Sequence, residues 1–215
     1  MKKVFMFLLM LILALNSYSQ SNVTKFLGIP VDGSREKMEK QIEKKGFKKV
    51  VIGGENFFTG EFNGQEVILA VKTNKNKVCR ITVMDYDYID ENQIKNRFNQ
   101  LCYQFLNNPK YLLIDDIKMI DREEDIFYEM TVKNKTYEAG FYQIGAQEEI
   151  DTILSKYTKE QLNNPSKKLK KEIMKCVLET SKNNVVWFKI VENDRKYGIV
   201  IFYENVYNFP TGEDL

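Results

Sequence analysis

Residues 57–85 read FFTGEFNGQEVILAVKTNKNKVCRITVMD, which is three strand-like runs separated by two turn signals. Asn63-Gly64 is the strongest short hairpin signal, because both residues tolerate the positive φ angles of a tight turn. Asn74-Lys75-Asn76 marks the second turn. In the last run, alternation places the side chains of Cys79, Ile81 and Val83 on one face. The stretch therefore predicts an antiparallel meander.

A helix is expected on the N-terminal side of this meander. Ser34 is a suitable N-cap for a helix from about Arg35 to Lys45. Met38 and Ile42 lie one turn apart and give it a narrow apolar stripe. Gly46 is a natural stop, because glycine readily adopts the left-handed conformation that ends many helices.

A second helix is expected directly after the meander. Asp90 and Gln93 have the spacing of a capping box. Five apolar residues then recur at helical spacing: Ile94, Phe98, Leu101, Cys102 and Phe105. Burying such a stripe is worth about 8–12 kcal/mol before chain entropy is subtracted. The helix should end at Asn107-Asn108-Pro109.

The remaining sequence predicts a hairpin, helices and a second hairpin. The first hairpin pairs 126–132 with 136–144, and the closing one pairs 185–191 with 197–203 around Asn193-Asp194. A helix is marked by Ile150, Ile153, Leu154 and Tyr157. Asn164-Pro165 is expected to cap and begin another helix, with proline in its first position. The apolar stripe of that helix comprises Leu169, Ile173, Cys176, Val177 and Thr180.

These elements together predict an α+β fold of antiparallel β meanders with helices packed on one face. Residues 20–108 form a helix-plus-meander half, and residues 109–215 form a hairpin-helices-hairpin half. The halves are either two domains or one continuous domain. No residue-level repeat relates them.

Residues 1–19 have the pattern of a cleavable signal peptide. Lys2 and Lys3 precede an apolar run of 12 residues, Val4–Leu15. Ser17 and Ser19 then fit the small-residue cleavage pattern, so the cut is expected before Gln20. A membrane-spanning helix needs about 20 apolar residues, and no later segment is apolar enough to serve as one. We therefore expect an exported protein, periplasmic or extracellular.

Composition restricts the chemistry of this chain. It contains no histidine, which excludes Ser-His-Asp and Cys-His catalysis and histidine-ligated zinc. The 32 basic residues nearly balance the 30 acidic ones, whereas a nucleic-acid-binding protein usually shows a basic excess. We expect no cofactor, no metal and no nucleic-acid partner.

In three places the chain resembles short exported proteins of unknown function from Bacteroides-type bacteria. The similar segments are Phe26–Ser34, Phe62-Asn63-Gly64, and the ending from Ile201–Asn205 through Gly212–Leu215. They are turns and strand ends, so the resemblance implies export and a bacterial setting, and it supplies no activity and no site residues.

Two acidic clusters are candidate sites. DYDYIDE supplies Asp85, Asp87, Asp90 and Glu91 for calcium. A calcium loop beginning at Asp85 needs glycine and glutamate where Asp90 and Asn96 stand, so the spacing argues against it. The second cluster comprises Asp115, Asp116, Asp121, Glu123, Glu124 and Asp125. Paired carboxylates can cleave glycosidic bonds without histidine, yet the cluster reads as a solvated connection.

Three other groups of residues have a structural interpretation and a functional alternative. Cys79, Cys102 and Cys176 are expected to be buried thiols, with a Cys102–Cys176 disulfide as the alternative in an exported protein. Lys167, Lys168, Lys170 and Lys171 are expected to form a solvated helix face, with an acidic partner as the alternative. The candidate binding surface consists of aromatic residues near the C-terminus: Trp187, Tyr197, Tyr203 and Tyr207. The alternative is that these residues pack within a sheet covered on both sides by helices.

Alternation of helices and meanders resembles small envelope modules that bind or inhibit other proteins. The expected function is therefore an exported, non-catalytic binding or protein-interaction module of the bacterial envelope, acting on another envelope protein or a glycan. A carboxylate-dependent glycan hydrolase and a structural envelope component are the alternatives. A hydrolase should show a deep cleft with two facing carboxylates.

Overall fold

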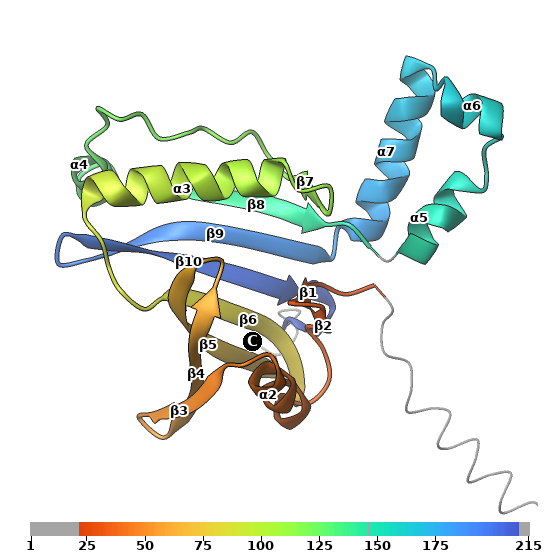
Figure 1. Cartoon of the computed structure of the whole chain (residues 1–215). Coiled ribbons are helices and arrows are strands. Elements are labelled where there is room, and N and C mark those ends of the chain that lie inside the picture. The colour runs from red at the N-terminus through yellow and green to blue at the C-terminus, as the bar shows by residue number, and fades with distance from the viewer. Residues whose placement is uncertain (1–21, 146, 211–215) are drawn as a thin grey trace, which may run out of the picture.

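The computed structural model describes residues 22–145 and 147–210. It has the predicted α+β fold, in which helices pack against one large antiparallel sheet (Figure 1). The signal peptide and the ending Gly212–Leu215 lie outside the described residues. Among the helices of the described ranges, none has the length and apolar character that a membrane crossing requires.

The large sheet has eight strands in the order β3-β4-β5-β6-β10-β9-β8-β7. The strands are β3 (Lys48–Ile52), β4 (Glu55–Phe62), β5 (Gln65–Asn74), β6 (Lys77–Asp85), β7 (Tyr111–Leu113), β8 (Glu138–Gln143), β9 (Asn184–Asn193) and β10 (Lys196–Asn205). A short second sheet pairs β1 (Lys25–Phe26) with β2 (Ile29–Pro30). Every pairing is antiparallel, as the meander pattern predicts.

Tight turns of the predicted kind join these strands. Asn63 and Gly64 have φ angles of 52° and 73° between β4 and β5. Lys75 and Asn76 turn the chain between β5 and β6 in the same way, with φ of 45° and 62°. The last hairpin turns at Asp194-Arg195, one residue later than the sequence pattern indicates.

One face of the sheet forms the core. Directly opposed residues of neighbouring strands have side chains on the same face. One such row crosses six strands and is buried throughout: Phe58, Leu69, Val83, Ile201, Phe188 and Ala139. The adjacent row, on the opposite face, is only half-buried: Phe57, Ala70, Thr82, Phe202, Trp187 and Gly140. The helices therefore cover one face, as expected.

Helices α2 (Arg35–Lys44) and α3 (Glu91–Leu106) contribute the buried stripes that the sequence predicts. Met38 and Ile42 of α2 are completely buried in the common core. Asp90 and Gln93 form the expected capping box at the start of α3. Farther along α3, the Phe98 ring meets Phe188 of β9 edge-on, with ring centroids 5.4 Å apart.

The fold contains an internal repeat that the sequence does not reveal. Helix α2 is followed by the meander β3–β6, and α3 is followed by β7–β10 in the same order. The halves meet where β6 pairs with β10, so the sheet order reads symmetrically outward from that pair. The predicted boundary between the halves, near residue 108, therefore does not separate two sheets, because β6 and β10 join both halves in one sheet.

Two insertions distinguish the second half. The first contains α4 (Ile126–Thr131), where a strand was predicted. That prediction was wrong because the Asp125 side chain accepts a hydrogen bond from the Tyr128 backbone N–H at 2.9 Å and caps a helical turn. Ile126 at the start of this turn is completely buried. The partner of β8 is instead β7.

The second insertion is an arm of three helices between β8 and β9 (Figure 1). They are α5 (Gln147–Leu154), α6 (Lys159–Asn163) and α7 (Lys167–Ser181). Helix α7 begins two residues later than predicted, because Ser166 is its N-cap and Pro165 precedes the cap. The predicted stripe of α7 is half-buried, and part of it lines the pocket described below.

Candidate functional site

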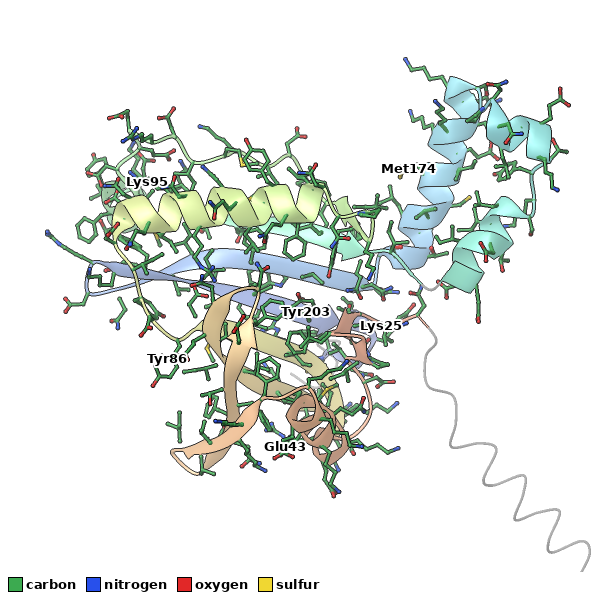
Figure 2. The ribbon with its side chains drawn as sticks, viewed as in Figure 1. Lys25, Glu43, Tyr86, Lys95, Met174 and Tyr203 are labelled. Carbon is green, nitrogen blue, oxygen red and sulfur yellow. The ribbon has the colours of Figure 1, made fainter. Side chains whose placement is uncertain are left out.

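A cleft of about 1310 Å³ opens between the two halves. The first half contributes β1, the end of α2 and the β4–β5 turn, and the second contributes the end of α3, β7 and the residues after β8. Figure 2 labels Lys25 and Tyr203, two residues that line this cleft. The repeat thus places segments from both halves around one cavity.

Two tyrosines and a glutamine form a polar group in the cleft. The side-chain amide of Gln143 donates to the Tyr111 hydroxyl at 3.2 Å, and the Tyr203 side chain is a neighbour of Tyr111. Burial raises the pKa of Tyr203 well above its ordinary value, and the neighbouring Tyr111 adds to the shift. Burial also raises the pKa of Tyr111, while its neighbours Gln143 and Tyr203 partly offset that rise.

The Tyr111 hydroxyl can bond more than Gln143. A phenolic hydroxyl has two acceptor positions and one proton. The Gln143 amide occupies one acceptor position of Tyr111, so the hydroxyl proton can donate to a ligand in the cleft. Burial raises the pKa of both tyrosines, so both are protonated at neutral pH.

The lining of the cleft is more basic than acidic. Lys25, Lys45 and Lys110 contribute three positive charges, and Glu61 is its one acidic residue. All four side chains are exposed. Nearby, Asn63 donates to the Gln104 side-chain oxygen at 2.8 Å and links the β4–β5 turn to α3. The cleft therefore favours an anionic or hydrogen-bond-accepting ligand.

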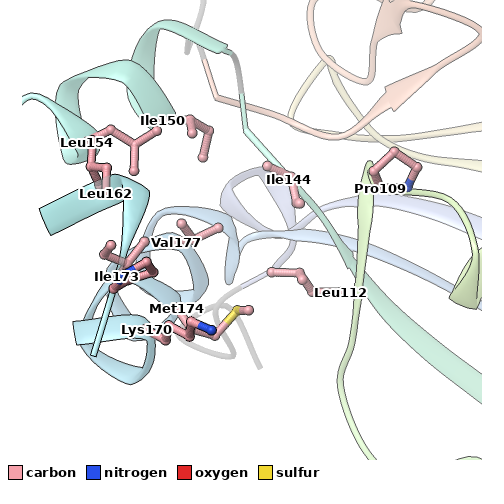
Figure 3. A pocket seen from close by; sticks show the side chains of 11 residues that line it. Pro109, Leu112, Ile144, Ile150, Leu154, Leu162, Lys170, Ile173, Met174 and Val177 are labelled. Atoms are coloured by element: carbon pink, nitrogen blue, oxygen red, sulfur yellow. The ribbon is translucent and has the colours of Figure 1, made fainter. Parts of the chain in front are cut away.

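An apolar pocket of about 670 Å³ adjoins the cleft (Figure 3). Its walls come from the arm, the chain after α3, and the β7–β8 edge. The lining consists of Pro109, Leu112, Ile144, Ile150, Leu154, Leu162, Pro165, Lys170, Ile173, Met174 and Val177. Lys170 is its one charged residue.

The cleft and the apolar pocket share wall residues. Pro109, Ile144 and Ile150 line both. The cleft and the pocket are therefore adjacent, and together they are called the composite cavity, polar in the cleft and apolar in the pocket. Both volumes are large enough for a small organic ligand, because ligand sites typically measure about 300–1,000 Å³.

The predicted acidic cluster belongs to neither cavity. Glu124 accepts hydrogen bonds from Lys135 and, at 2.7 Å, from the Tyr137 hydroxyl. Burial alone would raise the pKa of Glu124, but these two bonds outweigh it and hold the pKa below its ordinary value. Asp121 and Asp125 accept backbone N–H bonds from their own segment. These three carboxylates therefore serve the structure of the connection.

Three of the four acidic residues of DYDYIDE also have structural partners. Asp85 receives two bonds from Arg97 and one from the Ile199 backbone N–H. Asp90 caps α3, and Glu91 pairs with Lys95 at 2.9 Å. Within residues 22–145 and 147–210, no group of three or more Cys, Asp or Glu side chains is arranged to hold a metal ion.

The cysteines are free thiols, so the alternative Cys102–Cys176 disulfide is not formed. Cys79 and Cys102 are buried as expected, and Cys176 is half-buried. Burial raises the pKa of Cys102 to about 12, which makes its thiolate scarce at neutral pH. The lysines of α7 are exposed, as a solvated face requires.

The aromatic residues of the candidate binding surface are not brought together on one surface. Tyr197 and Tyr203 are 1% and 5% exposed, because their strand positions point into the core. Trp187 lies on the opposite face, stacked on Phe202 with ring centroids 4.2 Å apart. Tyr207 is exposed on the short helix η2 (Val206–Asn208). Of these four, Tyr203 alone lines the cleft.

The composite cavity depends on residues that the sequence did not single out as functional. Tyr111 and Gln143 supply its polar group, and Ile144 and Ile150 supply the shared wall. Comparisons with family models, curated proteins and solved structures give no match for this chain.

Proposed function

We propose that this protein is an exported, non-catalytic binding module of the bacterial envelope, which holds a small ligand in its composite cavity. The observation that carries the proposal is the shared wall: Pro109, Ile144 and Ile150 line both the cleft and the apolar pocket. A ligand in such a site can bury an apolar part and satisfy a polar part at once. The signal-peptide pattern of residues 1–19 supports export.

The functional groups of the cavity support binding without catalysis. A glycosidase of the usual kind needs two carboxylates beside its substrate, and Glu61 is the one acidic residue lining either cavity. The lining tyrosines have raised pKa values, so they do not act as bases near neutral pH. Histidine is absent from the sequence. Such a site binds and orients, and it offers no evident route for proton transfer.

Binding of N-phenyl-1-naphthylamine, an uncharged apolar fluorophore, tests this proposal. We expect saturable binding with one site per molecule of mature protein. Val177→Trp should abolish it, because a large ring added to the α7 wall fills the apolar pocket. Val132→Trp is the matched control, since Val132 is 60% exposed and lies outside both cavities. A non-saturating signal, or equal binding by both variants, would contradict the proposal.

Activity assays test the hydrolase alternative. Glycan, peptide and ester substrates should remain intact when incubated with mature protein. Turnover that disappears in Glu61→Gln, or in an amide variant of Asp115, Asp116 or Glu124, would replace the binding module with a carboxylate-dependent hydrolase. A purely structural envelope component would show neither turnover nor fluorophore binding.

A further inference from the structure

We infer that the ligand is a single-chain amphiphile, a fatty-acid-like carboxylate whose acyl chain lies in the apolar pocket and whose head lies in the cleft. This inference rests on the proposed function and specifies the ligand of the same site. It follows from three properties of the composite cavity: an unused donor, an excess of positive charge, and an apolar extension.

The unused donor is the Tyr111 hydroxyl. It accepts a bond from the Gln143 amide at 3.2 Å and keeps a proton that can be donated to a ligand. Burial keeps Tyr111 and Tyr203 protonated at neutral pH, because it raises both pKa values. A ligand head at this position must accept a hydrogen bond. A carboxylate accepts strongly, since charge-assisted hydrogen bonds are about twice as strong as neutral ones.

Charge selects an anionic acceptor over a neutral one. Lys25, Lys45 and Lys110 line the cleft against Glu61, and the positive charges remain in excess when Glu149, which interacts with Lys25, is counted. Lys25 is also held near the tyrosine group, because its backbone bonds the same Gln143 amide that reaches Tyr111. These lysines are exposed, so their attraction should be long-range and weakened by salt.

The apolar pocket has space for an acyl chain, and apart from Lys170 its lining side chains are apolar. Ile150 and Leu154 of α5 face Ile173 and Val177 of α7 across it (Figure 3). These side chains offer no hydrogen bond to a sugar ring or a peptide backbone, and polar groups buried without a partner are costly. A polymethylene chain has no such groups. Each buried methylene strengthens binding by about 0.8 kcal/mol, which is about four-fold in affinity.

The position of the shared wall sets the order of head and chain. Leu112 directly follows Tyr111 in β7, so their side chains lie on opposite faces of the sheet, Tyr111 in the cleft and Leu112 in the apolar pocket. The two cavities meet at the sheet edge, where Ile144 and Ile150 line both. A chain that leaves the tyrosine group therefore passes around this edge to reach the pocket. Lys170 offers a second place for a head, at the apolar pocket itself, and the experiment distinguishes the two.

Calorimetric titration of the mature protein with saturated carboxylates from octanoate to palmitate tests the inference, at concentrations below micelle formation. The dissociation constant should fall about four-fold per added methylene and then level off when the pocket is full. The primary alcohol of equal length should bind at least about ten-fold more weakly than the carboxylate. Raising the salt concentration should weaken binding of the carboxylate and leave the affinity for the alcohol unchanged.

Variants locate the head. Tyr111→Phe should weaken binding of the carboxylate about ten-fold, because it removes a hydrogen-bond donor to a charged group. The affinity for the alcohol should hardly change. The double variant Lys25→Gln, Lys110→Gln should remove most of the salt dependence without altering the fold, since both side chains are exposed. Lys171→Gln is the control that should behave as wild type, because Lys171 is exposed and lines neither cavity. Weaker carboxylate binding in Lys170→Gln, without weakening in the Lys25→Gln, Lys110→Gln double variant, would overturn the assignment of the head to the cleft.

The experiments distinguish failure of the amphiphile inference from failure of the proposed binding function. If carboxylates show no chain-length dependence while N-phenyl-1-naphthylamine still binds in the pocket, the amphiphile inference is wrong and the binding module stands. If neither binds, the proposed function is wrong. Equal affinity for carboxylate and alcohol would show that the cleft does not select an anionic head, and it would overturn the inference that the ligand is a carboxylate.

Discussion

The side-chain amide of Gln143 bonds both backbone polar groups of Lys25, a residue 118 positions earlier in the chain. The Lys25 N–H donates to Gln143 Oε1 at 2.6 Å, and Gln143 Nε2 donates to the Lys25 carbonyl at 3.0 Å. One side chain thereby pairs with a backbone as a neighbouring strand would. It fastens β1 to the end of β8 and fixes one wall of the cleft.

We expect Gln143→Ala to lower the free energy of unfolding by about 1 kcal/mol, because it removes two exposed hydrogen bonds to the Lys25 backbone. Urea denaturation measures the change. Gln104→Ala is a control on the same cleft, since it removes a single exposed bond to the Asn63 side chain, and its loss should cost at most about 0.5 kcal/mol. Equal effects of the two substitutions would show that the Lys25 wall adds no stability.

Phe98→Ala should destabilise the fold by about 3–5 kcal/mol, because it leaves a cavity between α3 and the sheet. Phe98 is 1% exposed and meets the Phe188 ring edge-on. Tyr103→Ala removes an aromatic ring from the same helix, but Tyr103 is 56% exposed, so its unfolding midpoint should hardly change. An unchanged midpoint for Phe98→Ala would place the apolar stripe of α3 outside the core.

Glu124→Gln should destabilise the protein by about 1 kcal/mol at neutral pH. The hydrogen bonds from Lys135 and Tyr137 hold the pKa of Glu124 below its ordinary value of 4.5. A lowered folded-state pKa contributes stability above the ordinary value, and that stability is lost as the pH falls through the folded-state pKa. The difference between wild type and variant should therefore be full above about pH 5 and shrink on acidification.

The matched control is Glu36→Gln, which breaks an exposed i,i+4 pair with Lys40. Its unfolding midpoint should match wild type at every pH, because surface ion pairs contribute little. A Glu124→Gln effect that does not vary with pH would mean that the carboxylate charge is irrelevant to the connection between α4 and β8.

Much of the fold follows from local sequence signals, because the decisive interactions are local or periodic. The Asn63-Gly64 turn, the capping box of Asp90 and Gln93, and the apolar stripe of α3 all appear as predicted. By contrast, the segment 126–132 is helical because of one capping side chain and the burial of Ile126. Apolar residues in so short a segment fit either period, so the pattern could not decide.

The cavity could not be predicted, because it is made by pairings between distant segments. Tyr111, Gln143 and Tyr203 come from three strands that meet through the order β10-β9-β8-β7. The positions of the aromatic residues in the candidate binding surface could not be predicted for a related reason. Strand alternation shows that about half of them face each side of the sheet. The side that the helices cover depends on the pairing of β6 with β10, which the sequence does not show.

Export predicts a mature N-terminus at or next to Gln20, after removal of the segment with Lys2, Lys3 and the apolar run Val4–Leu15. Mass spectrometry of the protein from its native host measures the terminus. An intact Met1 on the mature protein would contradict export by a cleaved signal peptide.

Methyl NMR of isoleucine-labelled mature protein, titrated with decanoate, tests the central claim most directly. The claim is that one ligand occupies the cavity joined by the shared wall. We predict saturable shifts of the Ile144, Ile150 and Ile173 methyl signals, which line that cavity. Ile52 is 54% exposed on the β3 edge, and Ile190 is buried outside the cavity, so both should stay unmoved. Shifts confined to Ile52, or none at the three cavity residues, would contradict the account.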